Sequence, residues 1–134
     1  MLADLSLPWW WYILPAYLSI WSLVFGIWNF VDGTGMFKAF KINFKSQSVV
    51  DAFIIKNSAA RYLGIAAALI LGIWVFQTSE AVLTALIARL AMDALDLIAG
   101  LQTGLLEKPI PGAIQLSGMF LAPSIISIIL MFIL

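Results

Sequence analysis

Four stretches of the chain are almost continuously apolar, and polar residues concentrate between them. A helix that crosses a bilayer needs about 20 predominantly apolar residues, and each stretch reaches that length. The pattern predicts transmembrane helices at residues 10–31, 58–77, 81–101 and 112–134. We therefore expect an all-α fold, a four-transmembrane-helix bundle in which residues 1–134 form a single integral membrane domain.

The long connection between the first two predicted helices has an amphipathic pattern. Its phenylalanines recur at i, i+3 and i+7, and its lysines repeat that spacing one position later: Phe37, Phe40, Phe44 and Lys38, Lys41, Lys45. This spacing suits a short helix in the membrane interface, with phenylalanines towards the acyl chains and lysines towards the headgroups. We predict a basic amphipathic interfacial segment at residues 35–56, with an irregular loop as the alternative.

Composition supports the membrane class and narrows the chemistry. The chain is 63% hydrophobic and 10% charged, whereas a soluble domain is about a quarter charged. Seven basic and seven acidic residues cancel, so no net field favours nucleic acid. The chain has no cysteine and no histidine, which excludes thiolate nucleophiles, haem–histidine ligation and a Ser-His-Asp triad. We expect no cofactor and no metal.

The distribution of basic residues predicts an orientation in the membrane. The connection at residues 32–57 carries four lysines, and Lys108 lies between the third and fourth helices. The opposite side carries Asp4 and Glu80 and no basic residue. Because basic loops stay in the cytosol, both termini should face away from it. In a eukaryotic cell we expect this multi-pass protein in the endoplasmic reticulum.

Three charged residues interrupt the third apolar stretch: Arg89, Asp93 and Asp96. At about 100° per residue they fall within roughly 60° of one another on a helix. Charged side chains at membrane depth usually face a bundle interior and mark functional sites. Arg89 and Asp93 are at i, i+4 and can pair. Arg61 of the second helix lies at the depth of Asp96, which predicts an ion pair between helices.

Polar residues of the other helices are expected at the same depth, and with Arg61 they would bind substrate or support the charged residues: Asn29, Asn57, Tyr62 and Gln115. The predicted site is thus a polar pocket near the basic loop. Its catalytic residues would be Asp93 as general acid or base, Arg89 as stabiliser of a developing oxyanion, and Asp96. Interhelical hydrogen bonds and ion pairs that only fix helix packing are the alternative.

Two further patterns concern packing. Gly64, Ala68 and Gly72 form a ridge of small residues, which lets another backbone approach closely. We expect this ridge to meet the third helix, or to form a homo-oligomer if it is not used internally. The aromatic cluster at residues 9–12 is expected to anchor the first helix at the membrane interface.

The tract Asn57-Ser-Ala-Ala-Arg61-Tyr-Leu-Gly64 resembles the start of helix two in a fungal and bacterial family of small four-helix membrane proteins of unknown function, broadly similar to DoxX-like proteins. The basic tract at residues 37–44, Arg61, Asp96 (or Asp93) and Gly118 match that family's pattern. Gln115 stands where the family often has a histidine. The resemblance implies the four-helix architecture and a link to membrane-associated or secondary metabolism.

The sequence favours a membrane-embedded, cofactor-independent enzyme of the isomerase or cyclase type. Its substrate would be a lipophilic small molecule, such as a terpenoid, sterol or polyketide, drawn from the surrounding membrane lipid. A carboxylic acid in a low-dielectric pocket can hold a proton near neutral pH and donate it. The alternatives are a non-catalytic assembly subunit and a small oligomeric transporter or channel.

Overall fold

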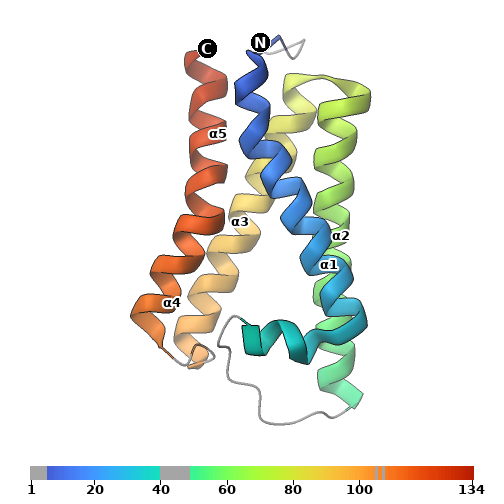
Figure 1. Cartoon of the computed structure of the whole chain (residues 1–134), viewed down its shortest axis with the longest axis vertical. Helices are drawn as coiled ribbons and strands as arrows, with labels where there is room; N and C mark the ends of the chain where they lie inside the picture. Colours follow the sequence, from blue (N-terminus) through green and yellow to red (C-terminus); the bar gives the residue numbers. More distant parts are fainter. Residues whose placement is uncertain (1–5, 40–48, 105, 107) are drawn as a thin grey trace.

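The computed structural model describes the backbone of residues 6–39, 49–104, 106 and 108–134, and the side chains of these residues except 33–39 and 49–52. The described part is all-α and contains four long helices (Figure 1). The helical segments follow in this order: the 3₁₀ turn η1 (Trp9–Tyr12), α1 (Ile13–Ala39), α2 (Val49–Ile70), the π-helical η2 (Leu71–Phe76), α3 (Ser79–Thr103), α4 (Pro109–Leu116), the π-helical η3 (Ser117–Leu121) and α5 (Ala122–Ile133). The all-α class and the four helices are therefore confirmed.

Three of the four helices are long and apolar enough to cross a membrane: Trp9–Asp32, Phe53–Phe76 and Pro109–Ile133. The chain therefore has the character of a multi-pass membrane protein. The fourth helix, α3, has 25 residues, and the charges of Arg89, Asp93 and Asp96 lie along it.

In the predicted interfacial segment at 35–56, residues 40–48 and the side chains of residues 35–39 and 49–52 lie outside the described part of the structure. Inside α1 the backbone leaves helical geometry at Asp32, where φ is −148° and ψ is 77°. Helix α2 begins at Val49, so residues 53–56 belong to the start of a candidate span. The phenylalanine and lysine pattern of residues 37–45 is thus still a prediction.

Two close helix contacts involve glycines. A methyl group on Gly26 of α1 would lie 2.5 Å from Leu63 Cγ of α2, so the two helices touch where Gly26 has no side chain. A methyl group on Gly72 would lie 3.3 Å from Val82 Cγ2 at the start of α3. Between these helices Gln77 adopts a left-handed φ of 53°, and its amide donates to the Gly72 carbonyl. This two-residue turn makes α2 and α3 antiparallel neighbours.

The small-residue ridge does not meet α3 along its whole length. Gly72 does, but Gly64 and Ala68 are exposed, and among the described residues no atom lies within 4 Å of a methyl placed on Gly64. The expectation that the whole ridge packs against the third helix is therefore wrong. The reason is the orientation of α2, whose buried face carries Ala59, Ala66 and Leu69 instead.

The aromatic cluster at the start of α1 divides between surface and core. Trp9 is 79% exposed, as an interfacial anchor requires, and Trp10 is also exposed. Trp11 instead is buried in the core, and its Nε1 donates to the Ser127 carbonyl of α5 over 3.1 Å. Burial of the Trp11 indole, together with the hydrogen bond from its N–H, ties η1, the turn directly before α1, to α5.

Pro123 determines the geometry of the last long helix. Proline lacks an N–H, and its ring clashes with the carbonyl four residues earlier in regular α-helix. The π-helical η3 ends at Leu121, immediately before α5, in which Pro123 is one of the first residues. A wider turn at this point relieves the clash without ending the helix. Its buried residue is Phe120, which contributes to the site described next.

Candidate functional site

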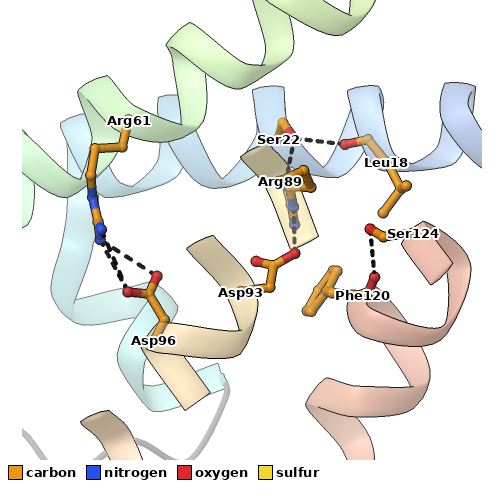
Figure 2. A network of polar contacts seen from close by, with 8 residues as sticks. All are labelled: Leu18, Ser22, Arg61, Arg89, Asp93, Asp96, Phe120 and Ser124. Atoms are coloured by element: carbon orange, nitrogen blue, oxygen red, sulfur yellow. Dashed lines mark hydrogen bonds and ion pairs between the residues drawn. The ribbon is translucent and has the colours of Figure 1, made fainter. Parts of the chain in front are cut away.

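Arg89 lies at the point where all four helices meet. It follows Val82, Ala85 and Leu86 on the buried face of α3, so helical periodicity alone directs it inward. Its side chain is completely buried. It contacts Ser22 of α1, Tyr62 of α2 and Phe120 of η3, and Asp93 one turn later on α3. Figure 2 shows its side chain between Ser22 and Asp93.

The Arg89–Asp93 ion pair forms as the i, i+4 spacing predicts. Arg89 Nε donates to Asp93 Oδ2 over 2.6 Å, and the Asp93 side chain is only 8% exposed. Arg89 Nη1 donates to Ser22 Oγ, which in turn donates to the Leu18 carbonyl over 2.7 Å. The serine hydroxyl therefore links the guanidinium to the backbone of α1. Pairing offsets part of the cost of burying two charges.

Two aromatic rings contact the same guanidinium group. The Arg89 Cζ atom lies 5.3 Å from the Tyr62 ring centroid and 5.4 Å from that of Phe120. Phe25 packs against both rings, at centroid distances of 5.4 and 5.1 Å. Cation–π attraction contributes about 0.5–2 kcal/mol per contact, most where water is excluded. The aromatic contacts hold the guanidinium in place beside Asp93.

The second predicted ion pair is also present, but it is not enclosed. Arg61 Nη2 lies 3.4 Å from Asp96 Oδ1 and also donates to Ser58 Oγ over 3.1 Å. The two charged side chains are 48% and 38% exposed. This pair links α2 to α3 on the flank of the bundle, whereas the sequence places it in the interior pocket. The two pairs lie on successive turns of α3 (Figure 2).

Two buried polar atoms have no hydrogen-bond partner among the residues that the structure describes. They are Arg89 Nη2 and Asn29 Oδ1. Asn29 is buried on α1, on the same face as Ser19 and Ser22, as its position along the helix predicts. A buried donor or acceptor without a partner costs about 1–3 kcal/mol, so each such atom in a folded protein calls for an explanation.

The structure gathers some of the predicted site residues and separates others. Tyr62, Arg89 and Asp93 lie together in the interior, and Asn29 is buried nearby along α1. Asn57 and Gln115 are exposed, and Gln115 Nε2 contacts Met119 Sδ of its own helix over 3.8 Å. The prediction that Asn57 and Gln115 point into a shared interior pocket is therefore wrong. Ser22 and Phe120 contact Arg89 directly and were not predicted as site residues.

Metal chemistry has no obvious ligand set in the described part of the chain. There, no group of three or more histidine, cysteine, aspartate or glutamate side chains is arranged to hold an ion. The site's polar groups are one guanidinium, one carboxylate, one hydroxyl and a phenol. These groups can hold or move a proton and can hydrogen-bond to an oxygen.

The function of this site has to be argued from its geometry, because comparison with known proteins finds no match. No protein-family model, curated protein or solved structure matches the chain. The resemblance to DoxX-like proteins stays a prediction.

Proposed function

We propose that α3 crosses the membrane together with the three candidate spans. Its 25 residues cover about 37 Å at 1.5 Å per residue, more than the roughly 30 Å hydrocarbon core. Its outer face exposes Ile87, Leu95 and Ile98, which suit lipid contact. Its most buried charge, Arg89, is paired within the protein. The three candidate spans packed around α3 and the burial of its Arg89 charge within the protein together support α3 as a fourth span.

With four spans, both termini lie at the same end of the bundle (Figure 1). The start of α2, which carries Lys56, and the start of α4, which follows Lys108, lie at the other end. The positive-inside rule then places the lysine-bearing end in the cytosol and both termini outside it. In a eukaryotic cell this topology suits the endoplasmic reticulum membrane.

Within this frame, the protein acts as a cofactor-independent isomerase or cyclase on a lipophilic molecule from the bilayer. The observation that carries this proposal is Arg89 Nη2, a buried donor without a partner in the described part of the chain, on the guanidinium that binds Asp93. A substrate carbonyl oxygen would satisfy this donor. A donor held rigidly in a low-dielectric site stabilises negative charge that develops on such an oxygen.

In an isomerisation, Asp93 takes a proton from a carbon next to the substrate carbonyl. The C–H electron pair moves into a new C=C bond, and the carbonyl π electrons move to the oxygen, where Arg89 Nη2 donates a hydrogen bond. Asp93 then returns the proton to another carbon of the conjugated system. The product is an isomer of the substrate, and neither oxidant nor reductant is consumed.

Asp93→Asn tests the proposal, with Glu80→Gln as the matched control. Both changes convert an acid to its amide on α3, but Glu80 lies exposed in the first turn. In cells, Asp93→Asn and a full deletion should accumulate the same lipid-soluble compound, which Glu80→Gln should not. Purified wild-type protein should convert that compound into an isomer of equal mass. An Asp93→Asn protein that restores the wild-type lipid profile would contradict the proposal.

A membrane assembly subunit is the second candidate, and one observation favours it. Gly64 and Ala68 expose a small-residue surface on α2 that no described part of the chain covers. Such surfaces let helices of two proteins approach closely. Gly64→Leu should then disrupt a cross-linked homo-oligomer in membranes, and Asp93→Asn should leave it intact. An unchanged cross-linking pattern in Gly64→Leu would contradict this alternative.

A further inference from the structure

The second unpartnered buried group, Asn29 Oδ1, has no role in the proton transfer. Asn29 follows Ser22 by seven residues, so the two lie on the same face of α1 and about 10 Å apart along its axis. Arg89 Nη1 donates a hydrogen bond to Ser22 Oγ, so Arg89 Nη2, on the same guanidinium, lies near the level of Ser22 along α1. Among the described residues, the interior therefore offers one buried donor and one buried acceptor without a partner, separated by about two helical turns along α1.

An apolar, largely aromatic cluster lies on the same stretch of α1. Phe25 and Phe120 are buried at its centre, and the partly buried side chains around them include Trp21, Trp28 and Met119. Ligand sites in proteins are typically lined by apolar and aromatic side chains with a few placed polar groups. The combination matches a molecule with an apolar body and one polar group at each end.

The helix arrangement gives such a molecule a direction. Helix α1 packs mainly against α2, and α3 packs against both α2 and α5. In Figure 1, α1 and α2 diverge from α3 and α4 towards the end of the bundle away from the termini. Asn29 lies nearer to that end than Ser22, because α1 runs towards it from the N-terminus. A ligand that bonds to both groups would have its inner end at Arg89 and its outer end at Asn29.

Charge restricts the ligand's inner group. Asp93 already balances the charge of Arg89, so an anionic group at Nη2 would leave a net negative charge in the interior. A neutral acceptor, such as a ketone or aldehyde oxygen, adds no charge. At the other end, Asn29 Oδ1 accepts only, so it requires a hydroxyl or another N–H or O–H donor.

We infer that Arg89 and Asn29 together select a neutral lipophilic hydroxycarbonyl compound, whose carbonyl oxygen and hydroxyl group stand about 10 Å apart. This inference rests on the proposed function, since it assigns the proposed enzyme a substrate class. Asn29 is here the residue that determines specificity, and it takes no part in proton transfer.

Binding of two rigid steroids to the protein in lipid nanodiscs tests the inference. Testosterone carries a carbonyl at one end and a hydroxyl at the other, whereas androstenedione carries a carbonyl at both ends. The wild type should bind testosterone about 2- to 10-fold more tightly, the worth of one neutral hydrogen bond. Asn29→Leu should abolish that preference and leave the affinity for androstenedione unchanged. Gln102→Leu, the same amide-to-leucine change at an exposed position of α3, should keep it.

Equal affinity of the wild type for the two steroids, or binding of neither, would overturn the inference. So would a preference that survives in Asn29→Leu, because the discriminating contact would then lie elsewhere. The proposed enzyme is tested separately by the lipid profile of Asp93→Asn. A normal profile together with an Asn29-dependent preference would leave a binding protein for such compounds and remove the isomerase.

Discussion

The buried ion pair between Arg89 and Asp93 predicts how substitutions on either side change the stability of the bundle. The perturbations are Asp93→Leu, Arg89→Met and the double variant, which replace the charges with apolar side chains of similar size. Asp93→Leu leaves a completely buried guanidinium without its carboxylate. Arg89→Met leaves a nearly buried carboxylate without its cation. The double variant leaves neither charge.

The magnitudes follow from burial and contacts. Breaking a buried ion pair from one side costs about 3–5 kcal/mol, because the remaining charge is uncompensated. Replacement of both charges by apolar residues of similar volume is often neutral or stabilising by about 1–4 kcal/mol. Here the double variant also loses the two cation–π contacts with Tyr62 and Phe120, about 0.5–2 kcal/mol each. We expect the double variant to be within about 2 kcal/mol of the wild type, and more stable than either single variant.

Equilibrium unfolding in mixed detergent micelles measures these differences, with the buried Trp11 and its neighbours as fluorescent reporters. Glu80→Leu is the control, because it removes an exposed carboxylate from the same helix. Its free energy of unfolding should stay within about 0.5 kcal/mol of the wild type. Single variants whose costs simply add in the double variant would show that Arg89 and Asp93 do not interact, and would refute the buried pair.

Three further predictions address packing around the site. Gly26→Ala should lower stability by about 1–3 kcal/mol, because its methyl would overlap a leucine of α2. Gly118→Ala should not lower stability, since no described atom lies within 4 Å of that methyl. Thermal unfolding of both variants measures the difference. Arg61→Ala should cost less than about 1 kcal/mol in the same assay, since its ion pair is exposed, and a larger loss would show that the pair is enclosed. Trp11→Phe should cost at least about 0.5–1.5 kcal/mol through its lost hydrogen bond, and an equal effect of Trp9→Phe would contradict the buried position of Trp11.

The positions of the four helices and the buried face of α3 could be predicted from the sequence. Charged side chains are so costly in hydrocarbon that they define which face is buried, even when the rest of the helix is apolar all round. The polar character of Asn29 likewise predicts an inward position on α1, and Asn29 is buried. The i, i+4 rule then gave the Arg89–Asp93 pair without reference to other helices.

The interior contacts from the other helices could not be obtained in this way. Phe120 reaches Arg89 through tertiary packing, and a phenylalanine in an apolar helix gives no signal that it will contact a cation. Tyr62 is predicted at the site as a polar residue, but the contact of its ring with the guanidinium also depends on tertiary packing. The aromatic cluster at residues 9–12 likewise could not be divided into exposed and buried residues from the sequence alone. Trp9 and Trp11 are chemically identical, and only the burial of one against α5 tells the anchor from the core residue.

The exposed position of Gln115 in the last long helix has a physical cause. Gln115 was expected inside because it is polar, yet it lies exposed, and its amide contacts the weak acceptor Met119 Sδ one turn later. Ser124 and Ser127 are buried, and their hydroxyls donate to the carbonyls four residues earlier, those of Phe120 and Pro123. Small hydroxyl residues that bond to their own helix carry no unpaired group into the interior and allow close packing. In the last long helix, the serines therefore mark the buried face better than the amide does. Ser124 donates to the carbonyl of Phe120, and the Phe120 ring contacts Arg89.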